Sequence, residues 1–175
     1  MEMIKDIADL ISDEQLLRQM AEECSELSEA ALNTITVDTN DFFTTEDSIN
    51  NLSEEIADVQ CCIDVFLFKY SETLYSISNS EKQLSDNDIL MKIAKESSKL
   101  AKWSLKLIRI NEGTTPVKIE DARSMLFEVM SNVVCYINVW IMKYPDLIQS
   151  IYEIKRFKMP RWKKRLENAL KEVKS

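Results

Sequence analysis

Two short acidic segments in the first half of the chain carry carboxylates at helical spacing. Glu23 and Glu26 are three residues apart, and so are Glu55 and Asp58. On a helix this spacing directs both side chains from one face. If the two helices pack against each other, the carboxylates converge and repel one another unless a cation lies between them. The pattern therefore predicts a divalent metal site formed by Glu23, Glu26, Glu55 and Asp58.

The composition narrows the kind of metal and the kind of chemistry. The chain contains no histidine, which excludes Ser-His-Asp triads, histidine-ligated zinc and di-iron bundles built on Glu-x-x-His pairs. The cysteines form no CxxC pattern and are expected to be buried in a reducing cytoplasm; they are Cys24, Cys61, Cys62 and Cys135. An all-carboxylate ligand set favours Mg²⁺, with Mn²⁺ as the alternative.

The whole chain fits one helical unit, which we expect to span residues 1–175. The chain has one glycine and three prolines, so it has few residues that favour tight turns, and an all-α fold is predicted. The formal net charge of -8 argues against nucleic acid as a partner. No segment resembles a signal peptide or a membrane-spanning helix, so a cytoplasmic protein without a membrane partner is expected.

Apolar residues at three- and four-residue steps predict the helices that must position these acids. They are expected near 13–33, 46–76, 87–111, 118–143 and 146–174. Asp13 is predicted to cap the first of them. Asn33 to Thr45 is predicted to be a loop that carries Phe42 and Phe43. Packing of these rings against the core is favoured slightly over stacking on a nucleotide base.

The sequence also repeats itself. Ala21–Leu27 matches Ala94–Leu100, and Leu52–Tyr70 matches Leu126–Tyr144 in the same order and at nearly the same spacing. We therefore predict two tandem related halves, residues 1–80 and 81–175, each built on a two-helix unit. Chance similarity between amphipathic helices is the alternative explanation.

The second half lacks most of the acids of the first. When the two halves are aligned, Lys95 takes the position of Glu22 and Lys99 that of Glu26. Val129 takes the position of Glu55, and Asn132 that of Asp58. Only Glu23 keeps a carboxylate, at Glu96. The apolar pattern survives where the acids do not, so the helical fold alone does not require them. This contrast predicts a single metal site, in the first half.

The acidic segments together resemble the motifs of the all-α nucleoside triphosphate pyrophosphatases, which include MazG-like enzymes and dimeric dUTPases. They are Glu22-Glu23-Cys24-Ser25-Glu26 and Glu55-Ile56-Ala57-Asp58. The resemblance implies a MazG-like helical bundle and a magnesium-dependent hydrolase that cleaves between the α- and β-phosphates of a nucleotide. It implies a catalytic set made of the four predicted ligands and Glu22, which either orients water or lies on the solvated flank of its helix.

The origin of the phosphate-binding charge is less direct. Members of that superfamily often place a basic residue before the second motif, where this chain has Asn50, Asn51 and Ser53. Lys69, the second half's Lys95 and Lys99, and the basic stretch at residues 155–165 are the candidates, with Phe42 and Phe43 as candidate base contacts. A homodimer of such two-half chains is also expected to be possible.

Two other interpretations of the acids remain open at the level of sequence. The acidic pairs are ordinary solvated helix faces under one of them, since surface glutamates are common. Under the other, the chain is a non-catalytic helical interaction module or a nucleotide-sensing module that binds without turnover.

Overall fold

The computed structural model describes residues 1–37, 42–74 and 84–172, with the side chains at 42–44 outside this description. All regular structure in these ranges is helical, which confirms the predicted all-α fold. The helices are α1 (Glu2–Leu10), α2 (Asp13–Thr36), α3 (Phe42–Tyr70), α4 (Asp86–Asn111), α5 (Ile119–Lys143) and α6 (Leu147–Glu172).

Several boundaries differ from those predicted. The helix α1 was not predicted, and the cap of α2 is Ser12 rather than Asp13. The Ser12 hydroxyl accepts a hydrogen bond from the backbone N–H of Gln15, and the Gln15 side chain accepts one from the N–H of Ser12, which completes a capping box. The predicted loop at 33–45 is shorter, because α2 continues to Thr36 and α3 already begins at Phe42.

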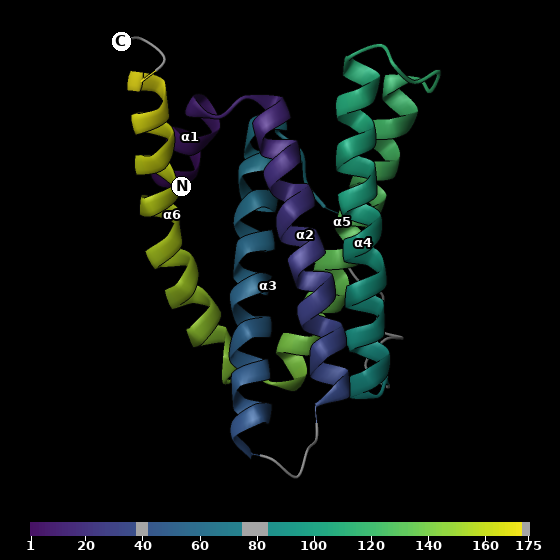
Figure 1. Ribbon diagram of the computed structural model, residues 1–175, viewed down its shortest axis with the longest axis vertical. Helices are drawn as coiled ribbons and strands as arrows, with labels where there is room; N and C mark the ends of the chain where they lie inside the picture. Colours follow the sequence, from purple (N-terminus) through teal and green to yellow (C-terminus); the bar gives the residue numbers. More distant parts are fainter. Residues whose placement is uncertain (38–41, 75–83, 173–175) are drawn as a thin grey trace.

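The helices form an elongated bundle whose two helix pairs meet through α2 and α4. In Figure 1, α2 lies between α3 and α4, while α5 packs on α4. The last helix, α6, contacts α3 and α1 on the side of the bundle away from α4. The first half therefore lies next to α6, and this neighbour becomes important for the acidic residues.

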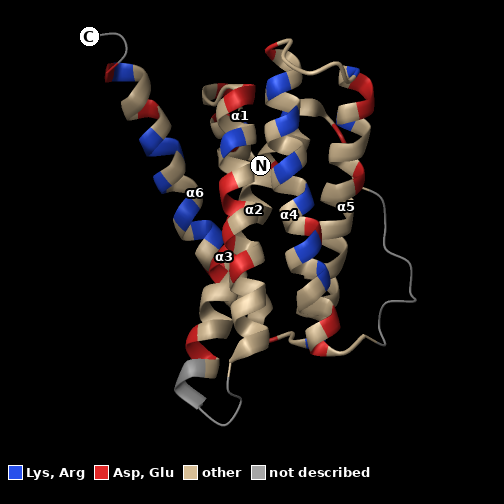
Figure 2. Ribbon diagram, turned by 45° about the vertical axis from the view of Figure 1, so that its right-hand side comes forward, with Lys and Arg blue, Asp and Glu red and all other residues tan. Residues whose placement is uncertain are grey.

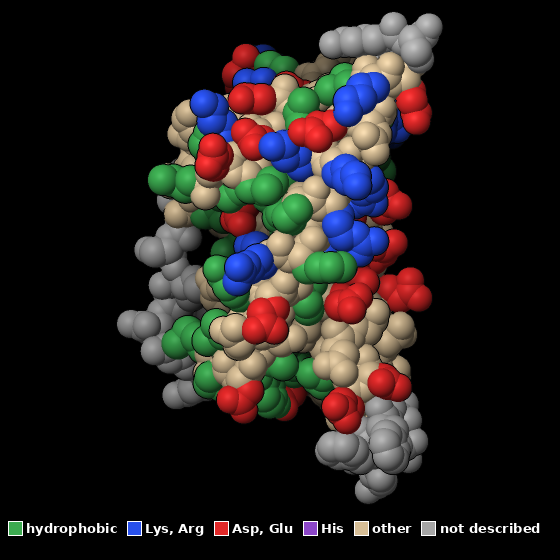
Figure 3. Space-filling view, turned by 90° about the vertical axis from the view of Figure 1, so that its left-hand side faces the viewer, with side chains coloured by type: hydrophobic (Ala, Val, Ile, Leu, Met, Phe, Trp, Pro, Cys, Tyr) green, Lys and Arg blue, Asp and Glu red, His purple; other side chains and the backbone are tan. Residues whose placement is uncertain are grey.

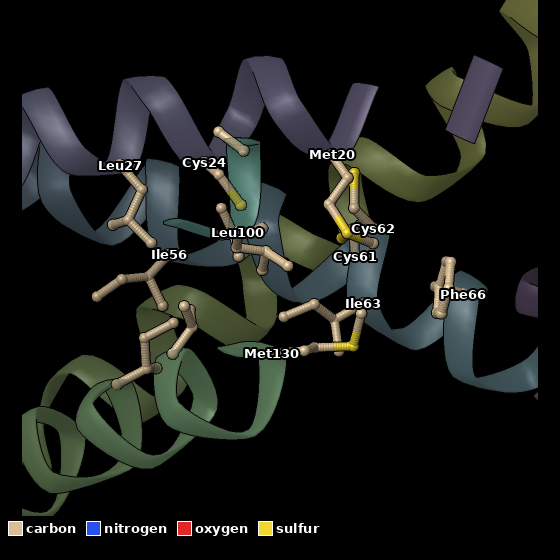
Figure 4. Close-up of a cluster of buried hydrophobic side chains, with 14 of the residues drawn as sticks. Met20, Cys24, Leu27, Ile56, Cys61, Cys62, Ile63, Phe66, Leu100 and Met130 are labelled. Carbon is tan, nitrogen blue, oxygen red and sulfur yellow. The ribbon is translucent and has the colours of Figure 1, made fainter. Parts of the chain in front are cut away.

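A continuous apolar core joins the two pairs and is rich in sulfur (Figure 4). Met20 ends beside Cys62 of α3, and Cys24 lies over Leu100 of α4. Cys24, Cys61 and Cys62 are buried free thiols, as predicted, while Cys135 is only half-buried. Each large side chain that is fully removed from water contributes about 1.5–3 kcal/mol of transfer free energy. This core holds α2 and α3 in fixed register.

Matching contacts recur at corresponding positions of the two halves. Ser12 and Ser85 both cap a helix by accepting from the backbone N–H three residues later. In each half, a lysine near the C-terminus of one helix lies next to an aspartate at the N-terminus of the helix before it, and an aromatic residue follows the lysine. The ion pairs are Lys69–Asp13 at 3.3 Å and Lys143–Asp86. Two tilted ring pairs, Phe66–Tyr70 and Trp140–Tyr144, both have centroids 4.5 Å apart. The origin of the halves by duplication stays a prediction.

The helix α5 is the most apolar helix of the described chain. An 18-residue window within Ile119–Lys143 has a mean hydropathy of 1.5. By length and composition, this helix could cross a membrane. In the bundle this helix packs on α4, and 39% of that window is buried. Core helices of soluble proteins pass the same test, so it weighs little either way.

Candidate metal centre

Three carboxylates from α2 and α3 meet beside the interface of these helices. Glu23, Glu26 and Glu55 each bring one carboxylate oxygen to within 4.8 Å of the other two. We call these three residues the acidic cluster. The structure thus brings together three of the four ligands predicted from the spacing, and places the fourth, Asp58, at the edge of the same cavity.

The packing of the two helices explains why these side chains converge. Cys24 and Leu27 are fully buried on α2, and Ile56 and Val59 are fully buried on α3. Glu23 and Glu26 flank the buried face of α2, so they emerge at the rim of the helix interface. Glu55 lies one position before Ile56 and emerges at the same rim from α3. The apolar positions therefore dictate where the acids meet.

The acidic cluster is electrostatically unfavourable without a cation. Burial raises the pKa of Glu23 to about 7, and repulsion from Asp58, Glu26 and Glu55 adds to this rise. A hydrogen bond donated by the Gln19 side chain opposes it. Burial also raises the pKa of Glu55 to about 7, with further repulsion from Glu26 and Asp58.

One carboxylate oxygen of the cluster has no protein partner. Glu55 Oε2 is buried and accepts no hydrogen bond from any described residue. A buried oxygen of this kind costs free energy unless a proton or a cation satisfies it. Three oxygen donors with an unsatisfied member fit a hard divalent cation such as Mg²⁺ or Mn²⁺, so the residues present suit the predicted metal.

Asp58 already has a cationic partner from another helix. Its carboxylate accepts a hydrogen bond from Lys158 of α6 and forms an ion pair with the same ammonium. Both side chains are largely shielded, with 19% of Asp58 and 31% of Lys158 exposed. Repulsion from the acidic cluster is therefore balanced at Asp58 but not at Glu23 and Glu55.

A cavity of about 620 Å³ separates the acidic cluster from α6. Its α6 side carries four cations, Lys158, Arg161, Lys164 and Arg165, which we call the basic wall. Arg161 packs over the ring of Phe157, and within the described residues Arg161, Lys164 and Arg165 form no ion pair. Trp162 is buried and also lines this cavity.

The figures show the same separation of charge. In Figure 2, Lys and Arg bands follow α6 and face the Asp and Glu bands of α2 and α3. In Figure 3, basic side chains gather along α6 with acidic side chains beside them. Opposite charges thus line two walls of one cavity, with room for a ligand between them.

Other predicted site residues lie elsewhere. Glu22 is exposed and does not line the cavity. Lys69 also lies outside it, because its ammonium donates to the carbonyls of Ala8 and Ile11 at 3.1 and 2.8 Å. It therefore holds the end of α1. The side chains of Phe42 and Phe43 lie outside the described residues, so the predicted base contact is not addressed.

The second half resolves the same acidic position in another way. Glu96 is buried, and its carboxylate pairs with Lys99 at 2.7 Å and with the Asn132 amide at 3.4 Å. Lys99 is therefore paired within its own half and does not line the cavity of the first half, and its expected role in phosphate binding stays a prediction. Lys95 is exposed and does not line that cavity either.

Two features of the site were not predicted residue by residue. The basic stretch of the tail was a candidate for phosphate binding, but the sequence did not indicate which of its residues face the acids. Alternate α6 positions point to different neighbours: Lys155 pairs with Asp64, Lys158 with Asp58 and Lys163 with Asp6. Gln19, which donates to Glu23, gave no signal beyond its position one turn earlier on α2.

No known protein family, curated protein or solved structure matches this chain. Function must therefore be argued from the site itself.

Proposed function

We propose that the chain is a metal-dependent nucleoside triphosphate pyrophosphohydrolase of the all-α, MazG-like kind. It would hydrolyse a nucleoside triphosphate to the monophosphate and pyrophosphate. The observation that supports this most directly is the pairing of an acidic cluster with a basic wall across one cavity. Carboxylates alone repel a polyphosphate, and cations alone do not need a metal, but a metal-bound polyphosphate uses both walls.

The size and charge of the cavity suit such a ligand. Its volume of about 620 Å³ lies within the range typical of small-molecule sites. Among the described residues, Arg161, Lys164 and Arg165 have no carboxylate partner, so they are available to bind phosphate oxygens. Arginine does this with two parallel hydrogen bonds, which also orients the phosphate chain.

The residues divide the chemistry between them. Glu23, Glu26 and Glu55 would hold the cation, with Asp58 as a fourth oxygen ligand once it is freed from Lys158. A bound divalent ion neutralises the phosphate oxygens and polarises the scissile phosphoryl group. The carboxylates that hold the cation would be engaged with it, and the divalent ion would activate the attacking water by lowering the pKa of that water.

The test is a panel of nucleoside triphosphates incubated with Mg²⁺ or Mn²⁺ and assayed for pyrophosphate release. Glu55→Gln should abolish release, because it removes a ligand carboxylate. Glu54→Gln is the matched control, since Glu54 is the neighbouring residue on α3 and its side chain is 58% exposed. Absence of release from every nucleotide would refute the enzymatic proposal.

A nucleotide sensor is the second candidate, and one observation favours it. The enzymes that the acidic motifs resemble often carry a basic residue shortly before the second motif. This chain has Ser53 in that segment, and Ser53 is buried and donates to the Ile49 carbonyl. That side of α3 faces the bundle and supplies no charge to the cavity. Binding of a nucleotide with Mg²⁺ that proceeds without turnover would select the sensor. The predicted cytoplasmic location and homodimer are independent of this choice.

A further inference from the structure

Lys158 occupies a position in the site that differs from the other cations of the basic wall. It lines the cavity, yet its ammonium is engaged with Asp58 and lies 4.0 Å from Glu54. Asp58 is consequently absent from the group of carboxylates that approach one another closely, which contains Glu23, Glu26 and Glu55 alone. One cation of α6 thus withholds one carboxylate from the metal centre.

We propose that Lys158 is a latch shared between Asp58 and the phosphate chain of the ligand. Without a polyphosphate, Lys158 holds Asp58 and competes with the metal for it. A polyphosphate on the basic wall draws the ammonium to its own oxygens, and Asp58 is released to complete the metal centre. Metal and polyphosphate then bind cooperatively, each removing an obstacle to the other. This inference rests on the proposed function and concerns how its two ligands communicate.

The structure allows Lys158 to change partner without moving α6. Two other ion pairs fix this helix, Lys155 to Asp64 of α3 and Lys163 to Asp6 of α1, both at 2.7 Å. They lie on either side of Lys158 along α6, so the helix remains anchored when the Lys158 pair opens. Met159 and Trp162 are buried and add apolar anchorage over the same segment.

The side chain itself suits this role. Lysine carries its charge at the end of a flexible stem with several rotatable bonds, so it exchanges partners more readily than a two-point arginine contact. The next cavity-facing cation, Arg161, is one turn away on the same face and has no carboxylate partner in the part of the chain that the structure describes. A phosphate bound at Arg161 would therefore lie within the range that Lys158 can reach.

A simpler explanation is that Lys158 only clamps α6 to α3, and Lys155 provides the control for it. Both lysines bridge the same two helices, but only Lys158 contacts a predicted metal ligand. A clamp predicts that Lys158→Met and Lys155→Met behave alike. The latch predicts opposite changes in metal and polyphosphate binding for Lys158→Met and none for Lys155→Met.

The experiment measures binding of two probes to the full chain. The first is Mn²⁺ alone, followed by electron paramagnetic resonance, and Lys158→Met should bind it at least about fivefold more tightly than wild type. The second is inorganic tripolyphosphate with the metal-free protein, followed by calorimetry, and Lys158→Met should bind it at least about fivefold more weakly. Lys158→Gln, which keeps a donor but not the charge, gives the same expectation should the methionine variant not fold.

The outcomes separate the latch from the site on which it depends. Mn²⁺ affinity of Lys158→Met equal to that of wild type and Lys155→Met would overturn the latch while leaving the metal centre intact. Absence of Mn²⁺ binding by every variant would overturn the proposed metal centre and the latch with it. Weaker Mn²⁺ binding by Lys158→Met would show that Lys158 supports the centre rather than competing with the metal, which also refutes the inference.

Discussion

Replacing Glu55 with glutamine should stabilise the metal-free protein while it destroys the site. Glu55 has a buried, unpartnered Oε2, and its pKa rises from 4.5 to about 7. Above pH 7 the Glu55 carboxylate is therefore charged in both states, and this charge costs more free energy in the folded protein than in the unfolded chain. The full rise corresponds to about 3 kcal/mol of unfavourable free energy. Because Glu55 is only half-buried, solvent screening reduces the expected gain from Glu55→Gln to about 1–2 kcal/mol.

The assay is thermal and urea unfolding in a chelator at pH 8 and pH 5. At pH 8 the gain should raise the Tm by about 2–8 °C for a chain of this size. At pH 5 it should fall to about a quarter, because the carboxyl is then largely protonated in the folded state. Glu54→Gln removes the same charge from the exposed neighbouring position and should change stability by less than about 0.5 kcal/mol.

Magnesium should reverse the order of stability. A cation that binds only the folded protein stabilises it by about 2.7 kcal/mol at a hundred times its Kd, so wild type should gain and Glu55→Gln should not. The reasoning is refuted if Glu55→Gln is no more stable than wild type at pH 8 in chelator. An equal gain from Glu54→Gln would refute it too, since the effect would then reflect net charge and not the cluster.

Three further predictions follow from the same contacts. The metal-free protein should lose stability as pH rises from about 4.5 to about 7, because Glu23 and Glu55 bind more protons in the folded protein than in the unfolded chain over this range. Urea titrations measure this loss, and saturating Mg²⁺ should flatten it. Lys99→Met should cost about 1–2 kcal/mol by leaving buried Glu96 without its cation, and unchanged stability would show that the pair contributes nothing. Lys69→Met should cost about 1–2 kcal/mol through its lost carbonyl contacts but leave Mn²⁺ affinity unchanged; a change in affinity would return Lys69 to the site.

The sequence was sufficient for the five long helices and for all three residues of the acidic cluster, because both follow from local periodicity. Glu23 and Glu26 had to share a face once α2 was helical, and Glu55 had to emerge beside the buried Ile56. The short α1 was not predicted although its apolar residues recur at helical spacing, because nine residues are fewer than an isolated helix usually needs. The cap at Ser12 was missed because Asp13, an equally good capping residue, follows it directly.

The partners of the lysines could not be predicted, because they depend on how helices distant in sequence pack. Lys158 meets Asp58 only because α6 returns across α3, and Lys69 meets the end of α1 only because an unpredicted helix ends there. A lysine-rich stretch predicts positive charge but not its direction. Lys99 was predicted to supply charge to the site of the first half. In the structure its ammonium donates a hydrogen bond to Glu96 of its own half.

The two halves offer two solutions to one electrostatic problem. A carboxylate at the rim of a packed helix pair, Glu23 or Glu96, must be neutralised if the pair is to be stable. In the second half a lysine and an amide from the chain itself do this permanently, so Glu96 needs nothing from solution. In the first half the neighbouring positions are also acidic, so the chain adds to the charge instead of cancelling it, and Glu55 keeps an unsatisfied oxygen. A helix pair that only needed to fold would have gained stability from the arrangement at Lys99. We therefore propose that the cost retained at Glu23 and Glu55 reflects a site for a cation.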